Sequence, residues 1–218
     1  MPGPLFLALL VPLATGLLQL GDGTTRRLEL VRGRVLASEP WRLASAHFVH
    51  YSLQHWLVDA LAFGALLLVC GLRAPARTLA TLALSAPAIS LAVLAWVPGL
   101  ERYRGLSGLD SALFGLALAL ELRARRAPLV LVAGALFAAK VAFELATGTA
   151  LFVDGSGQGF TPVPLAHAVG ALVGLACGLV GASTRSPWPV APILPRAAPT
   201  PGPARRAVLA APARPSRP

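Results

Sequence analysis

Ser107 and His167 are the two side chains whose types and positions together indicate nucleophilic chemistry. A serine hydroxyl becomes a nucleophile when an imidazole takes its proton, and such a pair supports acyl transfer. Ser107 lies in Gly105-Leu106-Ser107-Gly108, where the glycines allow a sharp turn into a helix. His167 lies three residues before Gly170, the first of three glycines spaced four residues apart. Such a stripe of small residues favours close helix packing, so we expect the serine and the histidine to meet between two helices.

The elements that must position this pair are apolar helices. Of the 218 residues, 56% are hydrophobic and only 13% are charged, whereas soluble domains carry about 25% charged residues. This composition excludes an ordinary soluble fold, and the two cysteines inside apolar runs exclude a disulfide scaffold. Six segments approach the length of about 20 apolar residues that a membrane helix needs. They are residues 4–20, 47–70, 78–97, 107–122, 129–151 and 163–183. We therefore predict an all-α, polytopic membrane protein with six transmembrane helices in one domain, residues 1–183.

The basic residues predict orientation in the lipid bilayer. A net charge of +10 is compatible with nucleic-acid binding, but nearly all of the arginines lie between or after the apolar segments. Basic residues of membrane proteins gather on the cytoplasmic side. With the N-terminus inside, the inner segments carry 11 arginines and the outer loops 7. The bias predicts both termini in the cytoplasm and no nucleic-acid partner. Residues 184–218, rich in Pro, Ala and Arg, are predicted to form a disordered cytoplasmic tail.

Ionisable side chains inside the predicted spans indicate function, because they are costly in a bilayer. The second, fourth and sixth spans run in the same direction, so Ser107 and His167 are expected at similar depth near the outer face. His55 is eight residues into the second predicted span, about 12 Å from its start at 1.5 Å per residue. A hydroxyl and two imidazoles are thus expected to converge in the outer half of the membrane. The other ionisable groups in these spans are Asp59, Asp110, Lys140 and Glu144.

These motifs resemble those of the rhomboid family of intramembrane serine proteases, in the same order and across residues 5–183. The matching features are Trp41-Arg42 in the first loop, His50-Tyr-Ser-Leu-Gln-His55, Gly105-Leu106-Ser107-Gly108 and Ala166-His167-Ala168-Val169-Gly170. The compact six-span form and the pair Lys140 and Glu144 further resemble rhombosortases. These are bacterial members of the family that process proteins bearing a C-terminal Gly-Gly and membrane-anchor signal.

The resemblance implies hydrolysis of a peptide bond in a transmembrane protein substrate, in a bacterial inner membrane and without a cofactor. Ser107 would be the nucleophile and His167 the general base and then the general acid, with no acidic third member required. The Ser107 backbone N–H, His55 and the Gly105 segment would stabilise the oxyanion. Lys140 and Glu144, four residues apart, are expected to form a structural ion pair. His47, His50 and Glu39 form too sparse a ligand set for zinc, and no metal is expected.

Asp59 departs from the family pattern, which has asparagine at this position. An ionised carboxylate only accepts hydrogen bonds and would repel an oxyanion. A protonated Asp59 would donate instead, or Asp59 would orient His55 without touching the substrate. A third alternative is an inactive, rhomboid-like pseudoprotease that binds membrane proteins. A small transporter using Asp59, Lys140 and Glu144 as a relay would leave the Gly-Ser-Gly and His-Gly arrangements unexplained. The sequence does not indicate the oligomeric state.

Overall fold

The computed structural model of the protein describes residues 3–18, 21–151, 153 and 161–180. The predicted tail, residues 184–218, and the end of the sixth predicted span lie outside these residues. The elements are α1 (Pro4–Leu18), α2 (Asp22–Leu28), β1 (Leu30–Val31), α3 (Arg32–Ala37), α4 (Arg42–Ser45), η1 (Ala46–Phe48), α5 (Leu53–Arg73), α6 (Pro75–Trp96), β2 (Arg102–Tyr103), α7 (Ser107–Arg123), α8 (Ala127–Thr147) and α9 (Pro164–Leu179).

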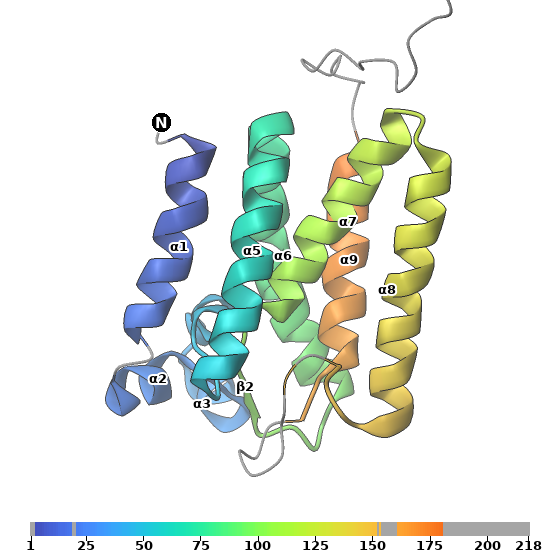
Figure 1. Ribbon diagram of the computed structural model, residues 1–218. Helices are drawn as coiled ribbons and strands as arrows, with labels where there is room; N and C mark the ends of the chain where they lie inside the picture. Colours follow the sequence, from blue (N-terminus) through green and yellow to red (C-terminus); the bar gives the residue numbers. More distant parts are fainter. Residues whose placement is uncertain (1–2, 19–20, 152, 154–160, 181–218) are drawn as a thin grey trace, which may run out of the picture. The chain divides into compact units, whose positions relative to one another are not determined.

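The long helices alternate in direction. Figure 1 shows α1, α6 and α8 running opposite to α5, α7 and α9. Helix α7 packs against α5, α6, α8 and α9, while α1 packs against α5. The common direction of α5, α7 and α9 places their N-termini at one end of the bundle, beside α2, α3 and β2 (Figure 1). This confirms the predicted common direction of the segments that carry His55, Ser107 and His167.

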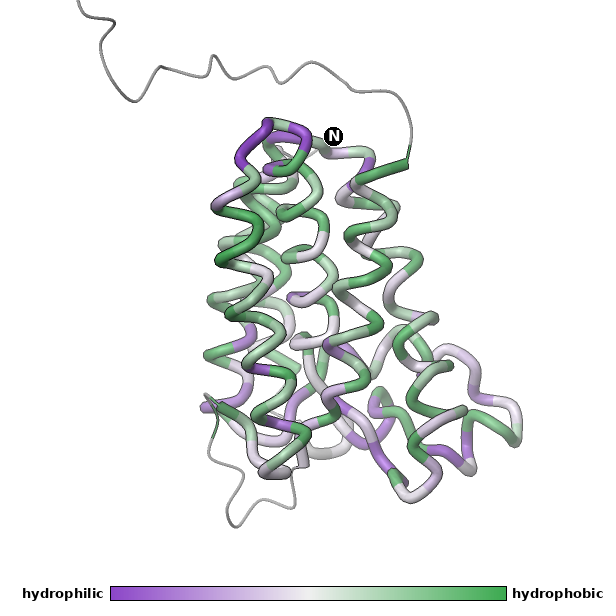
Figure 2. The backbone as a smooth tube through the Cα atoms, turned by 90° about the vertical axis from the view of Figure 1, so that its right-hand side faces the viewer, coloured by the Kyte–Doolittle hydropathy of each residue, from purple (hydrophilic) through white to green (hydrophobic). Residues whose placement is uncertain are grey.

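The outer surface of the helices is apolar. Helices α5, α6 and α8 are long and apolar enough to cross a membrane, and α1 and α9 are shorter apolar helices. Large apolar side chains point outward along them, and such continuous exposed surface is typical of a membrane protein. Examples are Leu61, Leu91, Leu131, Leu136 and Leu172. Figure 2 shows the helices mostly green, with purple gathered towards the ends of the bundle. The count of six spans stays a prediction.

Helix α5 begins later than predicted. Residues 46–48 form η1, and α5 starts only at Leu53, after Ser52. The Ser52 hydroxyl accepts the backbone N–H of His55 at 3.1 Å and caps the helix. His55 therefore lies in the first turn of α5, and the predicted depth of eight residues into a helix is wrong. The apolar residues before Ser52, such as Ala46 and Val49, belong to η1 and to the buried segment after it, which composition alone does not distinguish from a membrane helix.

The first loop, residues 21–52, is fastened to the segment that precedes Ser107. Strand β1 pairs antiparallel with β2, with Leu30 opposite Tyr103. Glu29, which is buried, accepts from Arg104 at 2.8 Å. The Arg104 guanidinium also lies over the ring of Tyr51, 4.9 Å from its centroid. The loop thereby holds the backbone that leads into α7.

Arg42 holds this loop together from within. Its side chain is 2% exposed and donates to the Glu29 carbonyl at 2.6 Å and to the Arg26 carbonyl at 3.1 Å. It also pairs with Glu39. The adjacent Trp41 is exposed. Arg42 therefore anchors the first loop to itself through the carbonyls of α2 and the residue that follows it.

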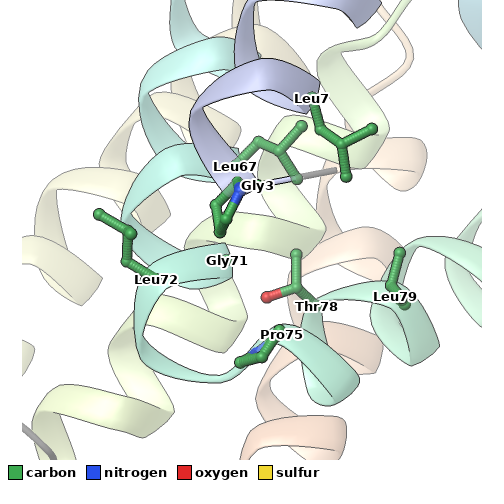
Figure 3. A pocket seen from close by; sticks show the side chains of 9 residues that line it. Gly3, Leu7, Leu67, Gly71, Leu72, Pro75, Thr78 and Leu79 are labelled. Atoms are coloured by element: carbon green, nitrogen blue, oxygen red, sulfur yellow. The ribbon is translucent and has the colours of Figure 1, made fainter. Parts of the chain in front are cut away.

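An apolar pocket lies at the opposite end of the bundle from Ser107. It is lined by the start of α1, the end of α5 and the start of α6, and Figure 3 shows Leu7, Leu67 and Leu79 around it. Thr78 supplies the hydroxyl among its lining residues. None of its described lining residues is ionisable, so they include no general base, and the pocket lies away from Ser107.

Candidate active site

Ser107 and His167 meet across the interface of α7 and α9. Ser107 is the first residue of α7 and is half-buried, while His167 is the fourth residue of α9 and is 6% exposed. The Ser107 Oγ lies 3.1 Å from the His167 Nε2. This is hydrogen-bond distance for a nucleophile and its base. The structure therefore brings together the two residues that the sequence predicts as a pair.

Glycines make this approach possible. A Cβ placed on Gly170 would collide with the Gly108 carbonyl oxygen, and one placed on Gly174 would collide with the Ala112 carbonyl oxygen. On the facing helix, Gly115 lies just as closely against the carbonyl of Ala171. Helix α9 thus packs directly on the backbone of α7, as the glycine stripe predicts. The short distance between helices brings the imidazole to the serine.

Glu144 contacts His167, which its place in the sequence does not predict. It lies on α8, is 3% exposed, and its Oε2 is 2.8 Å from the His167 Nδ1. Its other oxygen, Oε1, accepts from the Lys140 Nζ at 2.8 Å, which confirms the predicted pair. The Lys140 Nζ is also 3.1 Å from the His167 Nδ1. The expectation of a purely structural ion pair is therefore incomplete. The four-residue spacing of Lys140 and Glu144 indicates that both charges lie on one face of their helix. It does not indicate that this face contacts His167.

Asp59 lies on the other side of Ser107. Its Oδ2 accepts the Ser107 backbone N–H at 3.1 Å. The same oxygen is 3.2 Å from the His55 Nε2 and 3.3 Å from the His50 Nε2. All three of these side chains are buried. The Ser107 N–H, which is expected to hold an oxyanion, thus donates to the Asp59 carboxylate in this structure. His55 lies beside the same carboxylate.

Gly105 allows the loop to pass over this cluster. Its φ of +124° is in a region that favours glycine. A Cβ at this position would lie 3.0 Å from the His55 Nε2 and 3.3 Å from the Asp59 Oδ2. The Gly105 N–H donates to the Ala46 carbonyl at 3.2 Å. Gly105 therefore lies within the predicted cluster, where a larger residue would displace the loop that carries Ser107.

Two buried histidines that precede α5 support the site. The His50 Nε2 accepts the Leu106 N–H at 3.3 Å, and burial lowers the pKa of His50. The His47 Nε2 lies 2.9 Å from the Ala86 carbonyl, to which it donates. Burial lowers the pKa of His47 to about 4. Because both imidazoles are neutral at pH 7, the contact of His50 with Leu106 and that of His47 with α6 are hydrogen bonds between neutral groups.

Asp110, one turn after Ser107, has one buried oxygen, Oδ1, with no hydrogen-bond partner among the described residues. Its place in the first turn of α7 agrees with an acidic group near the positive end of a helix dipole. Within the described ranges, no group of three or more His, Cys, Asp or Glu residues is arranged to hold a metal ion.

The comparison with known families agrees with this arrangement. The family model for the Rhomboid domain matches residues 37–184. No curated protein matches the sequence. The matched segment is more than half of the chain and contains every residue of the cluster around Ser107 and His167. The chain belongs to the rhomboid family.

Proposed function

We propose that this protein is an intramembrane serine protease that hydrolyses a peptide bond in a transmembrane-anchored protein. The observation that carries the proposal is the 3.1 Å approach of the Ser107 Oγ to the His167 Nε2 at the start of two helices. Among rhomboids, both proteases and pseudoproteases occur, and an intact serine–histidine pair favours a protease.

The chemistry proceeds in two halves. The Ser107 Oγ attacks the scissile carbonyl carbon while the His167 Nε2 takes the hydroxyl proton. His167 then returns that proton to the leaving amine as the C–N bond breaks, which leaves an acyl-serine. A water molecule attacks the acyl carbon, His167 takes its proton, and the Ser107 oxygen recovers that proton as it leaves.

The oxyanion is stabilised by the Ser107 backbone N–H and by His55. In the proposed reaction Asp59 acts in one of two ways. Protonated Asp59 donates to the oxyanion, or Asp59 gives up the Ser107 N–H to it and orients His55 through the contact at 3.2 Å. Both are supported by the position of the Asp59 Oδ2, 3.1 Å from the Ser107 backbone nitrogen.

The proposed location is a bacterial inner membrane with both termini in the cytoplasm, so that Ser107 lies near the outer face. The excess of arginines in the predicted inner segments supports this orientation. The proposed substrate is a protein with a C-terminal sorting signal and membrane anchor, as for rhombosortases. The contacts of Lys140 and of the buried Glu144 with His167 support this finer assignment.

A second candidate function is favoured by one observation, the Asp59 carboxylate on the Ser107 N–H. An ionised carboxylate there would oppose an oxyanion, so the protein would bind membrane-anchored proteins without cleaving them. This pseudoprotease would retain a reporter protein and release no product.

A membrane-anchored reporter distinguishes the two functions. We expect the wild-type protein to cleave the reporter and Ser107→Ala and His167→Ala to abolish cleavage. Ser85→Ala, which removes a buried hydroxyl on α6, serves as the matched control and should retain activity. Cleavage that survives both substitutions, or a wild-type protein that binds the reporter without cleaving it, would overturn the protease assignment.

A further inference from the structure

We propose that Glu144 is a positioning residue that holds His167 in the tautomer with a proton on Nδ1, so that Nε2 is free to accept the Ser107 proton. The inference rests on the proposed protease function and adds a third member to its serine–histidine pair. It also assigns Lys140 a role, because the lysine competes for the same histidine nitrogen.

The geometry of the His167 imidazole supports this role of Glu144. Its two nitrogens face two different groups, with the Glu144 Oε2 at 2.8 Å from Nδ1 and the Ser107 Oγ at 3.1 Å from Nε2. An ionised carboxylate can only accept, so Nδ1 must carry a hydrogen. A neutral imidazole has a single N–H, and Nε2 is then left with the lone pair that a general base needs.

Lys140 lies where it could reverse this tautomer. Its Nζ lies 3.1 Å from the His167 Nδ1 as well as 2.8 Å from the Glu144 Oε1. An ammonium group can only donate. If it donated to Nδ1, the imidazole proton would move to Nε2, and His167 could not accept the proton of Ser107.

Glu144 prevents this outcome with its two oxygens. Oε1 accepts from Lys140 and Oε2 faces Nδ1, so the carboxylate neutralises the ammonium and takes the histidine N–H at the same time. The pair is nearly enclosed, with Glu144 3% and His167 6% exposed. Hydrogen bonds to a charged group are stronger than those between neutral groups, and stronger still away from water. The carboxylate also stabilises the imidazolium that forms when Ser107 loses its proton.

The test is a set of variants at these two positions, assayed with the reporter. Glu144→Gln keeps the shape but removes the charge, and we expect kcat to fall about 10²- to 10⁴-fold with KM unchanged. Lys140→Met alone should change kcat by less than about tenfold. The double variant should be more active than Glu144→Gln alone, because the group that competes for Nδ1 is gone. Glu121→Gln, at the other end of α7, is the matched control and should leave kcat unchanged.

A spectroscopic readout is independent of activity. The chain has four histidines, so nitrogen-15 NMR of the detergent-solubilised, histidine-labelled protein can identify the His167 tautomer, with His167→Asn providing the assignment. We expect the wild type to be protonated on Nδ1 and Glu144→Gln to be protonated on Nε2. Thermal unfolding of each variant shows whether the fold is retained.

The outcomes separate the two proposals. If Ser107→Ala abolishes cleavage but Glu144→Gln is fully active, or if the tautomer is the same in both proteins, the role of Glu144 is overturned and the protease function stands. If the wild type does not cleave the reporter, the protease function fails. The tautomer measurement then still decides whether Glu144 orients His167.

Discussion

The backbone N–H of Ser107 donates to the Asp59 Oδ2 at 3.1 Å. These residues lie 48 positions apart, on α7 and α5, and Gly105 is the residue whose missing side chain lets them meet. The donor that would stabilise a reaction oxyanion is therefore already satisfied by a carboxyl group. In the proposed reaction, that carboxyl group must therefore be protonated or displaced.

Asp59→Asn should preserve or raise the rate of reporter cleavage. An amide of nearly the same shape can donate a hydrogen bond to an oxyanion and removes the negative charge that opposes it. Asp110→Asn, on the first turn of α7, is the control for loss of a buried carboxyl group near Ser107. Complete loss of cleavage in Asp59→Asn, with Asp110→Asn active, would show that the carboxylate itself is required.

Gly174→Ala should destabilise the protein and separate Ser107 from His167. The added methyl would collide with the Ala112 carbonyl oxygen, and overpacking of this kind costs about 1–3 kcal/mol. We expect a lower thermal unfolding temperature in detergent and slower cleavage. Gly134→Ala on α8 is the matched control, because a Cβ there has nothing within 4 Å. Equal stability of the two variants would contradict the close packing of α9 on α7.

Arg42→Ala should unfold the first loop far more readily than Arg34→Ala does. Both arginines pair with Glu39. The side chain of Arg42 is 2% exposed, whereas that of Arg34 is 60% exposed. Removing Arg42 leaves the buried Glu29 carbonyl without its donor, which costs about 1–3 kcal/mol, whereas an exposed ion pair such as that of Arg34 contributes about 0–1 kcal/mol. Limited proteolysis of residues 21–52 would report the difference, and similar cleavage rates in the two variants would refute the anchoring role.

The stability of the protein should fall as the pH falls from about 6.5 to about 4. Burial lowers the pKa of His47 from 6.5 to about 4 and also lowers that of His50. The unfolded chain therefore binds more protons than the native protein in this window, which favours unfolding. The stabilisation is fully present above pH 6.5, and for His47 it amounts to about 3 kcal/mol.

His47→Gln tests this origin of the acid sensitivity. Glutamine can still donate to the Ala86 carbonyl, but it does not titrate. Unfolding temperatures measured in detergent between pH 4 and 8 should depend less on pH in the variant than in the wild type. Identical pH profiles would assign the acid sensitivity to other groups.

The sequence predicted the parts of the site that are encoded locally. Ser107 follows a glycine turn, and the stripe at Gly170 and Gly174 marks the face of α9 that packs on α7, so both halves of the pair could be found. The start of α5 could not be predicted, because the apolar residues before Ser52 are equally suited to a buried loop. The contact of Glu144 with His167 depends on how α8 is rotated against α9, and spacing within one helix does not specify this rotation.

The most direct test of the central claim is covalent labelling of Ser107 by a fluorophosphonate probe, with the adduct mapped by mass spectrometry. A serine activated by His167 should form the adduct at Ser107 in the wild type, and His167→Ala should form little or none. Absence of the adduct from wild-type protein, or equal labelling of Ser107 in wild type and His167→Ala, would contradict the account.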